Sequence, residues 1–184
     1  MSNKKYQIIY ADPPWKYNDR SLNRGGAERH YKTTSNDQLE MMDVNSIADE
    51  DCILFMWATF PKMQEALELI KAWGFTYKTN AFTWIKKNKK ADSLFWGMGR
   101  WTRSNAEVCL LAVKGKPKRI NMGIHSVIEH PIMSHSKKPD SVRDSIISLV
   151  GDLPRLEMFA RESAAGWDVF GNEAPNSIEI GTKK

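Results

Sequence analysis

Short runs of apolar residues alternate along this 184-residue chain with segments in which apolar residues recur every three or four positions. The apolar runs are rich in β-branched and aromatic residues, which favours strands. Strands are predicted over residues 6–11, 52–58, 107–113 and 155–160, with shorter extended segments over 75–77, 80–86, 126–128 and 167–170. Continuous apolar runs of this kind are typical of strands that are buried on both faces of a sheet.

Helical spacing of apolar residues predicts three helices, over 35–42, 61–73 and 140–150. Ser35 with Gln38 three residues later has the sequence of a capping box, and Asp140 can cap the third helix. Gly74 and Gly151 follow the last apolar residues and can end the second and third helices. Strands alternating with amphipathic helices predict an α/β fold, with a mostly parallel central sheet flanked by helices.

The length of the chain fits one domain, which we expect to span residues 1–174, with a polar and frayed tail over 175–184. Two aperiodic polar stretches, 20–34 and 87–105, are predicted to be long loops. Loops of this length in compact domains are commonly functional.

Several sequence features indicate a cytoplasmic protein. The two cysteines, Cys52 and Cys109, lie inside apolar runs, as core thiols of a reduced compartment do. No apolar stretch approaches the roughly 20 residues of a membrane span, and residues 1–5 lack the apolar segment of a signal peptide. The four histidines are too scattered along the chain to predict a metal site.

The charge pattern favours a nucleic-acid partner. The chain has 27 Lys and Arg against 22 Asp and Glu, for a net charge of +5. Four basic residues cluster tightly: Lys86, Lys87, Lys89 and Lys90. The neighbouring sequence carries aromatic residues, namely Trp84, Phe95, Trp96 and Trp101. Basic groups can contact phosphates while aromatic rings stack on bases. The alternative is a solvated basic face, the usual role of a single lysine run.

The most specific motif is Asp12-Pro13-Pro14-Trp15, directly after the first predicted strand. Ligands of α/β sheets bind beyond the carboxyl ends of strands, a rule that also selects residues 59–60 and 161–173. The prolines lack N–H groups, so carbonyl oxygens accompany the Asp12 carboxylate as acceptors. Such a pair matches a primary amine, and Trp15 offers a flat surface to a planar ring. An aromatic amine such as adenine or cytosine is implied, although the motif could simply end a strand.

From residue 7 to residue 173 the chain resembles the MT-A70-type family of S-adenosylmethionine-dependent adenine N6-methyltransferases. The resemblance rests on Asp12-Pro13-Pro14-Trp15 and on further stretches at 30–34, 83–86, 102–107, 110–117, 135–140, 156–161, 166–167 and 171–173. It implies a Rossmann-like methyltransferase fold, S-adenosylmethionine as cofactor and a nucleic-acid substrate. The compact chain is similar to stand-alone bacterial and phage members, whose usual substrate is DNA.

The resemblance also implies roles for individual residues. The catalytic motif would be Asp12, Pro13, Pro14 and Trp15. The cofactor would be held by Asp12, Lys138, Glu157, Arg161, Asn172 and Glu173. The nucleic acid would contact Tyr31, Trp84 and Glu107, with Tyr31 closing over the site, and the charge pattern adds Lys86 and Lys87 as substrate contacts. Five residues precede Tyr6, so we expect no counterpart of the upstream segment with which longer members contact the adenine of the cofactor.

Simpler interpretations and other functions stay open at this stage. Arg161 could pair with Glu162 or Asp168, and Asn172 after Gly171 fits a turn as well as a ribose contact. A base inside a duplex cannot reach such a pocket, so it must be flipped or unpaired. The alternatives to adenine methylation in DNA are methylation of adenine in RNA, methylation of cytosine N4 in DNA, and a catalytically silent nucleic-acid-binding partner.

Overall fold

The computed structural model describes residues 4–16, 34–99, 101–134 and 137–183 of the chain. The described strands are β1 (Tyr6–Ala11), β2 (Ala48–Ala58), β3 (Thr76–Lys87), β4 (Glu107–Lys114), β5 (Val127–Pro131), β6 (Arg155–Ala160) and β7 (Asp168–Gly171). The described helices are α1 (Asn36–Glu40), α2 (Met63–Ala72) and α3 (Ser141–Val150), together with two 3₁₀ turns, η2 (Val44–Ser46) and η3 (Phe60–Lys62).

The seven strands form one sheet in the order β5-β3-β4-β2-β1-β6-β7. Strand β1 lies inside the sheet, parallel to both β2 and β6. Strand β4 is antiparallel to its neighbours β2 and β3, whereas the other described pairs are parallel. This confirms the α/β fold with a mostly parallel sheet and is consistent with the Rossmann-like arrangement that the family resemblance implies.

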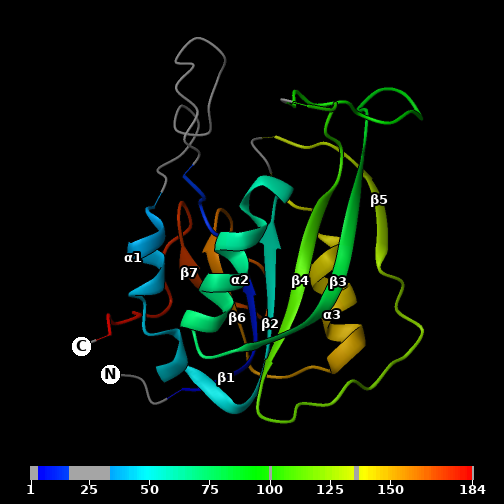
Figure 1. Cartoon of the computed structure of the whole chain (residues 1–184). Coiled ribbons are helices and arrows are strands. Elements are labelled where there is room, and N and C mark those ends of the chain that lie inside the picture. The colour runs from blue at the N-terminus through cyan, green and yellow to red at the C-terminus, as the bar shows by residue number, and fades with distance from the viewer. Residues whose placement is uncertain (1–3, 17–33, 100, 135–136, 184) are drawn as a thin grey trace.

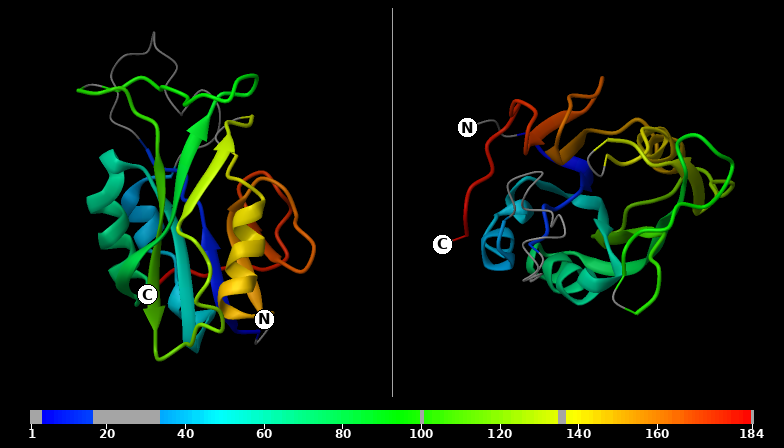
Figure 2. Two further views of the ribbon diagram at one scale, coloured as in Figure 1. Left: turned by 90° about the vertical axis from the view of Figure 1, so that its right-hand side faces the viewer. Right: turned by 90° about the horizontal axis from the view of Figure 1, so that it is seen from above.

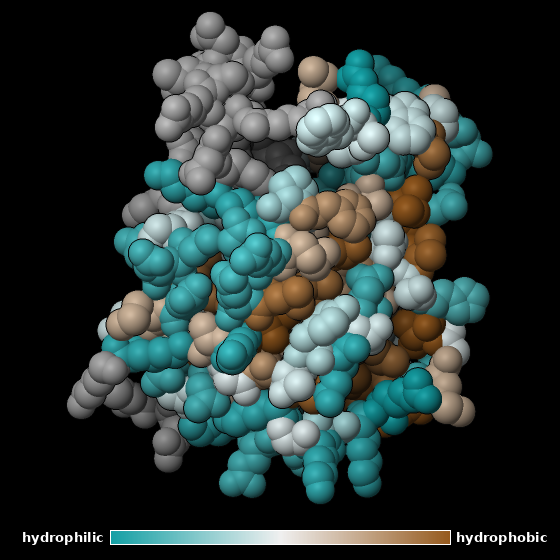
Figure 3. Space-filling view, in the orientation of Figure 1, coloured by the Kyte–Doolittle hydropathy of each residue, from teal (hydrophilic) through white to brown (hydrophobic). Residues whose placement is uncertain are grey.

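Helices cover both faces of the sheet, with α1 and α2 on one face and α3 on the other (Figures 1 and 2). The alternation of side chains along β1 separates two core clusters: Ile9 packs with α2 on one face, and Ile8 packs with α3 on the other. The Trp73 indole, buried beside α2, donates a hydrogen bond to the carbonyl of Leu39 at 2.8 Å and so joins α1 to α2. Figure 3 shows hydrophilic side chains over these helices and hydrophobic ones over the strands to their right.

The predicted elements differ from the observed ones mainly at their ends. The extended segments 75–77 and 80–86 are one strand, β3, interrupted by two register shifts. Strand β2 begins four residues before the predicted 52–58, with a polar start that the apolar pattern does not reveal. Asp140 stands at the N-cap position of α3, as expected, but without a side-chain cap. Its side chain makes no capping bond, because the carboxylate pairs with Arg143 at 2.6 Å and with Lys137 at 3.2 Å.

Residues 175–183, for which the sequence predicts fraying, reach the last carbonyls of α1 and α2. Ile178 and Ile180 pack against the core, and the Lys183 ammonium donates to the carbonyls of Glu40 and Ala72 at 2.7 and 2.5 Å. These carbonyls end α1 and α2, where a positive charge is favourable. Within the described ranges, no helix is long and apolar enough to cross a membrane.

Candidate active site

Two adjoining clefts lie at the edge of the sheet where β1, β2 and β6 end. The first is lined by Asp12, Pro13, Pro14, Trp15, Trp57, Ala58, Thr59, Glu107, Lys138, Phe159, Arg161 and Asn172. The second is lined by Tyr10, Asp12, Ser134, Lys137, Lys138, Arg143, Glu157, Phe159, Ala160, Arg161, Glu162 and Glu173. Four residues belong to both: Asp12, Lys138, Phe159 and Arg161. Two ligands bound side by side would therefore meet at these four side chains.

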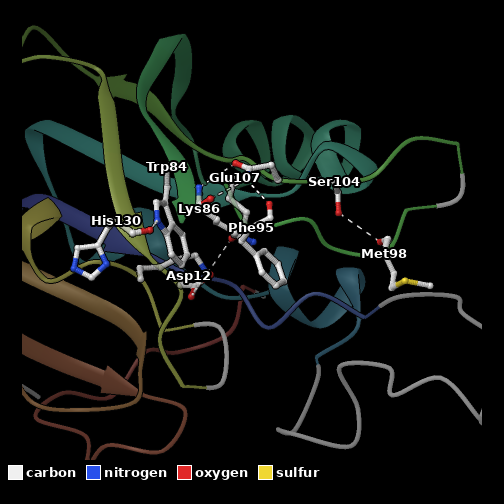
Figure 4. A network of polar contacts seen from close by, with 10 residues as sticks. Asp12, Trp84, Lys86, Phe95, Met98, Ser104, Glu107 and His130 are labelled. Carbon is white, nitrogen blue, oxygen red and sulfur yellow. Dashed lines mark hydrogen bonds and ion pairs between the residues drawn. The ribbon is translucent and has the colours of Figure 1, made fainter. Parts of the chain in front are cut away.

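A chain of alternating charges runs along the first cleft (Figure 4). The Lys138 ammonium lies 2.8 Å from a carboxylate oxygen of Asp12 and 3.3 Å from one of Glu107. The second oxygen of Glu107 accepts from the Lys86 ammonium at 2.5 Å. Lys138 also lies over the ring of Trp57, 5.5 Å from its centroid. The network fixes the orientation of Asp12 before any ligand binds.

Burial and pairing shift the pKa values of this network in different directions. Burial raises the pKa of Asp12, and the Lys138 ammonium opposes this rise. Burial alone would raise the pKa of Glu107, but Lys138 and Lys86 outweigh it and the pKa is lowered. For Lys138, burial would lower the pKa, yet Asp12 and Glu107 raise it. Glu107 and Lys138 are therefore charged near neutral pH, whereas burial leaves the pKa of Asp12 above its ordinary value.

The Asp12–Trp15 segment leaves β1 as a tight turn. The Trp15 amide donates to the Pro13 carbonyl at 2.8 Å, and the Thr34 amide donates to the Pro14 carbonyl at 3.1 Å. The Trp15 side chain is buried, with its indole N–H directed to the carbonyl of Trp57 at 3.3 Å. The Pro13 carbonyl thus has one intramolecular donor, and its second lone pair can still accept.

The second cleft contains a buried bidentate ion pair. The Arg143 guanidinium, on α3, donates to the two oxygens of Glu157 at 2.7 and 2.8 Å. Burial in the middle of β6 raises the pKa of Glu157, and Arg143 opposes this effect. The fork holds both oxygens in one plane and leaves each with acceptor capacity for a ligand.

Strand β6 ends in a strained conformation. Phe159 has a φ of +63°, the left-handed region that bulky residues avoid, at a cost of about 1–3 kcal/mol. Aromatic packing compensates: its ring stacks on Trp73 with centroids 6.5 Å apart and meets Phe170 edge-on. Backbone strain of this kind concentrates at ligand sites. Here it turns the chain so that Ala160 and Arg161 face the clefts.

A family model described as MT-A70 matches residues 6–173. The chain belongs to the MT-A70 family. The match confirms the expectation from sequence that this protein is an enzyme, an adenine-N6 methyltransferase. Methyltransferases of the MT-A70 family use S-adenosylmethionine.

Relatives of this MT-A70 chain occur in bacteria and in animals. It is 38% identical to the type II methyltransferase M.MunI of a Mycoplasma species, over all of this chain and 84% of that protein. It is 29% identical to the human N(6)-adenosine-methyltransferase catalytic subunit METTL3, over 92% of this chain and 28% of that protein. It is 28% identical to the N(6)-adenosine-methyltransferase MT-A70-like protein of Drosophila melanogaster, over 92% of this chain and 27% of that protein. The chain spans little more than a quarter of the length of these two animal relatives.

The MT-A70 chain brings most of its predicted site residues together. Arg161 and Asn172 line the first cleft, and Glu173 lines the second, because the chain after β7 folds back onto the end of β6. The amides of Asn172 and Glu173 both donate to the Ala160 carbonyl, at 2.9 and 3.2 Å. Together with Asp12, Lys138, Glu107 and Glu157, these side chains surround the two clefts.

Other predicted site residues lie elsewhere. Trp84 is buried beneath Lys86, whose ammonium is 5.2 Å from the ring centroid, and its indole donates to the His130 carbonyl at 2.8 Å. It is not among the described residues that line the two clefts. Lys87 pairs with Glu129 at 3.4 Å and with Asp92. Tyr31 lies outside the described residues.

The cleft residues to which sequence reasoning gave no role include Tyr10, Trp57, Arg143 and Phe159. Trp57 could have been found, because it lies at the carboxyl end of β2, where ligands of α/β folds bind. Its indole donates to the Tyr10 hydroxyl at 2.7 Å. Arg143 gave no signal, since its fork to Glu157 joins a helix to a strand and is visible only in three dimensions. Among the described residues, no group of His, Cys, Asp and Glu is placed to hold a metal ion.

Proposed function

We propose that this protein transfers the methyl group of S-adenosylmethionine to the exocyclic N6 of adenine in DNA, acting on a flipped or unpaired base. The observation that carries the proposal is the position of Asp12 on the boundary of the two clefts, paired with Lys138. The first cleft would take the base and the second the cofactor.

Two acceptors at the start of the first cleft suit an exocyclic amine. The Asp12 carboxylate and the Pro13 carbonyl would each accept one N6–H, which orients the nitrogen and favours a pyramidal geometry. The adenine lone pair is delocalised into the ring, so this geometry restores its reactivity toward the methyl group. The Asp12 carboxylate must be ionised to accept, and the Lys138 ammonium beside it favours ionisation.

The donor set of the second cleft fits S-adenosylmethionine. Glu157, held by Arg143, and the neighbouring Glu173 supply carboxylates for ribose hydroxyls. Arg161 supplies a cation for the carboxylate of the methionine part. When bound, the cofactor would supply a methyl group on a sulfonium sulfur, whose leaving group is a neutral thioether, and the N6 proton that the methyl group replaces would be released to solvent. The protein then contributes mainly proximity and orientation of the acceptor nitrogen.

The preference for DNA over RNA rests on the comparisons. The chain matches 84% of the bacterial type II methyltransferase, at higher identity than it matches the animal proteins. The animal proteins are named for adenosine, the ribonucleoside, and the chain covers little more than a quarter of their length. The compact chain thus shares more with the bacterial relative.

Methyl transfer to defined nucleic acids tests the proposal. Purified protein is incubated with labelled S-adenosylmethionine and with duplex DNA, single-stranded DNA or RNA of the same base composition, and the product nucleosides are separated. We expect N6-methyl-2′-deoxyadenosine. N4-methyl-2′-deoxycytidine or N6-methyladenosine as the sole product would replace the proposal with the corresponding alternative.

Two aspartate variants separate catalysis from binding. Asp12→Ala should abolish methyl transfer while leaving cofactor affinity largely intact, because Asp12 acts on the amine. Asp37→Ala, at an exposed position in α1, should leave the rate unchanged. Near wild-type turnover in Asp12→Ala would contradict the role assigned to this carboxylate.

A further inference from the structure

The loop that joins β3 to β4 is anchored to the charge network of the first cleft. The Asn105 side chain donates to the carbonyls of Lys86 and Phe95, at 2.9 and 2.5 Å, and accepts from the Lys86 amide at 3.0 Å. Lys86 in turn pairs with Glu107, two residues beyond Asn105 (Figure 4). The base of the loop is thereby fixed to the same edge of the sheet as Asp12.

Beyond this anchor the chain forms a narrow hairpin, which we call the finger and define as residues 97–99 and 101–104. Its two arms close where the Gly97 amide donates to the Ser104 carbonyl at 2.7 Å. A side chain at Gly99 would lie 1.9 Å from the Thr102 carbonyl oxygen, so the close approach of the arms requires glycine at this position. The finger stands at the edge of the sheet where β1 and β2 end (Figure 1).

The finger exposes large apolar side chains to water. Trp101 is 98% exposed and Met98 is 77% exposed, and Trp96 at the base is 57% exposed. Neither the core nor the proposed chemistry explains a tryptophan held outward on a glycine-dependent hairpin. Tryptophan in this situation is typical of a surface that binds a partner.

The charges in the segment around Trp101 indicate what kind of partner this surface binds. The segment from 88 to 106 contains four basic residues, Lys89, Lys90, Arg100 and Arg103, and one acidic residue, Asp92. Asp92 pairs with Lys87, and the Arg103 guanidinium lies 3.0 Å from the Met98 sulfur on the finger itself. An exposed indole two residues before an exposed guanidinium in the chain suits a polyanion with flat aromatic groups, which is the chemistry of nucleic acid.

We propose that Trp101 is a base-stacking contact for the nucleic-acid substrate and that Arg103 beside it contacts the phosphate backbone. The inference deepens the proposed function, on which it rests for the class of substrate. The anchor through Asn105 and Lys86 holds the finger in register with the first cleft, so that stacking by Trp101 and capture of the target base occur on one nucleic-acid strand.

Binding of a fluorescent DNA oligonucleotide, measured by anisotropy without cofactor, tests the assignment. Trp101→Ala should weaken binding at least about fivefold, the loss expected for one stacked base, whereas Trp101→Phe should retain most of the affinity. Met122→Ala is the matched control, because Met122 is also a large apolar side chain and is 80% exposed. It lies in a different loop, which is held to α3 by the amides of Ile120 and Asn121, both of which donate to the Leu149 carbonyl. The Met122→Ala variant should bind as the wild type does.

Two results would overturn the inference. One is unchanged DNA affinity in Trp101→Ala. The other is a change in oligomeric mass by light scattering that accounts for the weaker binding, which would make the finger an interface between copies of the protein. The methyl-transfer assay of the wild type keeps the two proposals apart. If the wild type binds DNA through Trp101 and methylates nothing, the proposed function fails and the stacking contact stands.

Discussion

At the scale of single residues, the chemistry of the two clefts depends on the ion pairs that surround the Asp12 carboxylate. Lys138 supplies the positive charge next to Asp12, and it also pairs with Glu107, which pairs with Lys86. Any ligand amine that hydrogen-bonds to Asp12 therefore joins an existing network and does not have to create one. The network keeps Asp12 oriented while its buried position raises its pKa.

The raised pKa of Asp12 predicts an acid limit to activity. Methyl transfer should fall as the pH decreases through a pKa above the usual 3.8 of an aspartate, because a protonated Asp12 carboxyl is a weaker acceptor for the amine. Lys138→Met removes a group that lowers this pKa, so the acid limit should move to higher pH. The measurement is the pH profile of kcat/KM, with Lys71→Met, an exposed lysine of α2, as control. An acid limit at the same pH in Lys138→Met would contradict the coupling.

Glu107 is expected to affect stability. Glu107→Gln leaves Lys138 and Lys86 without their shared carboxylate, and losing one partner of a buried ion pair costs about 3–5 kcal/mol. Because the folded pKa of Glu107 lies below its ordinary 4.5, its stabilisation is present above pH 4.5 and is lost as the pH falls through the folded value. Urea unfolding from pH 7 to pH 3 should show a weaker pH dependence in Glu107→Gln. Parallel curves for the two proteins would show that Glu107 carries no such linkage.

At the scale of elements, the carboxyl ends of β6 and β7 form the wall of the second cleft. Arg161→Ala and Glu173→Gln should each weaken S-adenosylmethionine binding by roughly tenfold, the effect of about 1.4 kcal/mol, because each removes a polar contact to the ligand in the second cleft. Nucleic-acid affinity should stay within twofold in both. Calorimetry gives the cofactor affinity, and unchanged binding in both variants would remove them from the cofactor site.

Elements with a continuous apolar run were predictable from sequence, and those defined by pairing were not. Strands β1 and β6 match their predicted bounds, because buried residues fill both. The sequence predicted β3 as two segments, since residues 76–79 are exposed and carry no continuous apolar run, although they pair with β4. The motif Asp12-Pro13-Pro14-Trp15 revealed the first cleft from sequence. The fork from Arg143 to Glu157 and the left-handed Phe159 depend on tertiary packing and left no trace in the sequence.

At the scale of the whole molecule, ion pairs separate the lysines of the predicted basic cluster into two groups. Lys86 and Lys87 are engaged with carboxylates, whereas Lys89 and Lys90 are exposed. Neutralising Lys89 and Lys90 to Ala should reduce the log–log slope of DNA binding against salt by roughly 0.7–0.9 for each phosphate that the protein no longer neutralises. Neutralising Lys87 alone should change the slope less. Binding of a labelled oligonucleotide at several salt concentrations measures both, and an unchanged slope in the first variant would identify these lysines as an ordinary solvated face.

The central position of β1 has a consequence for how the protein matures. One neighbour of β1, strand β2, follows it early in the chain, but the other is β6, so that Tyr10 pairs with Glu157. A chain emerging from the ribosome presents Asp12 well before β6 and cannot complete the surroundings of Asp12 until β6 has been synthesised, because contacts distant in sequence form late. Lys138, Arg161 and Asn172 also arrive late. The nascent enzyme therefore stays inactive until β6 and the residues that follow it have been made, and its activity reports on the completion of the sheet.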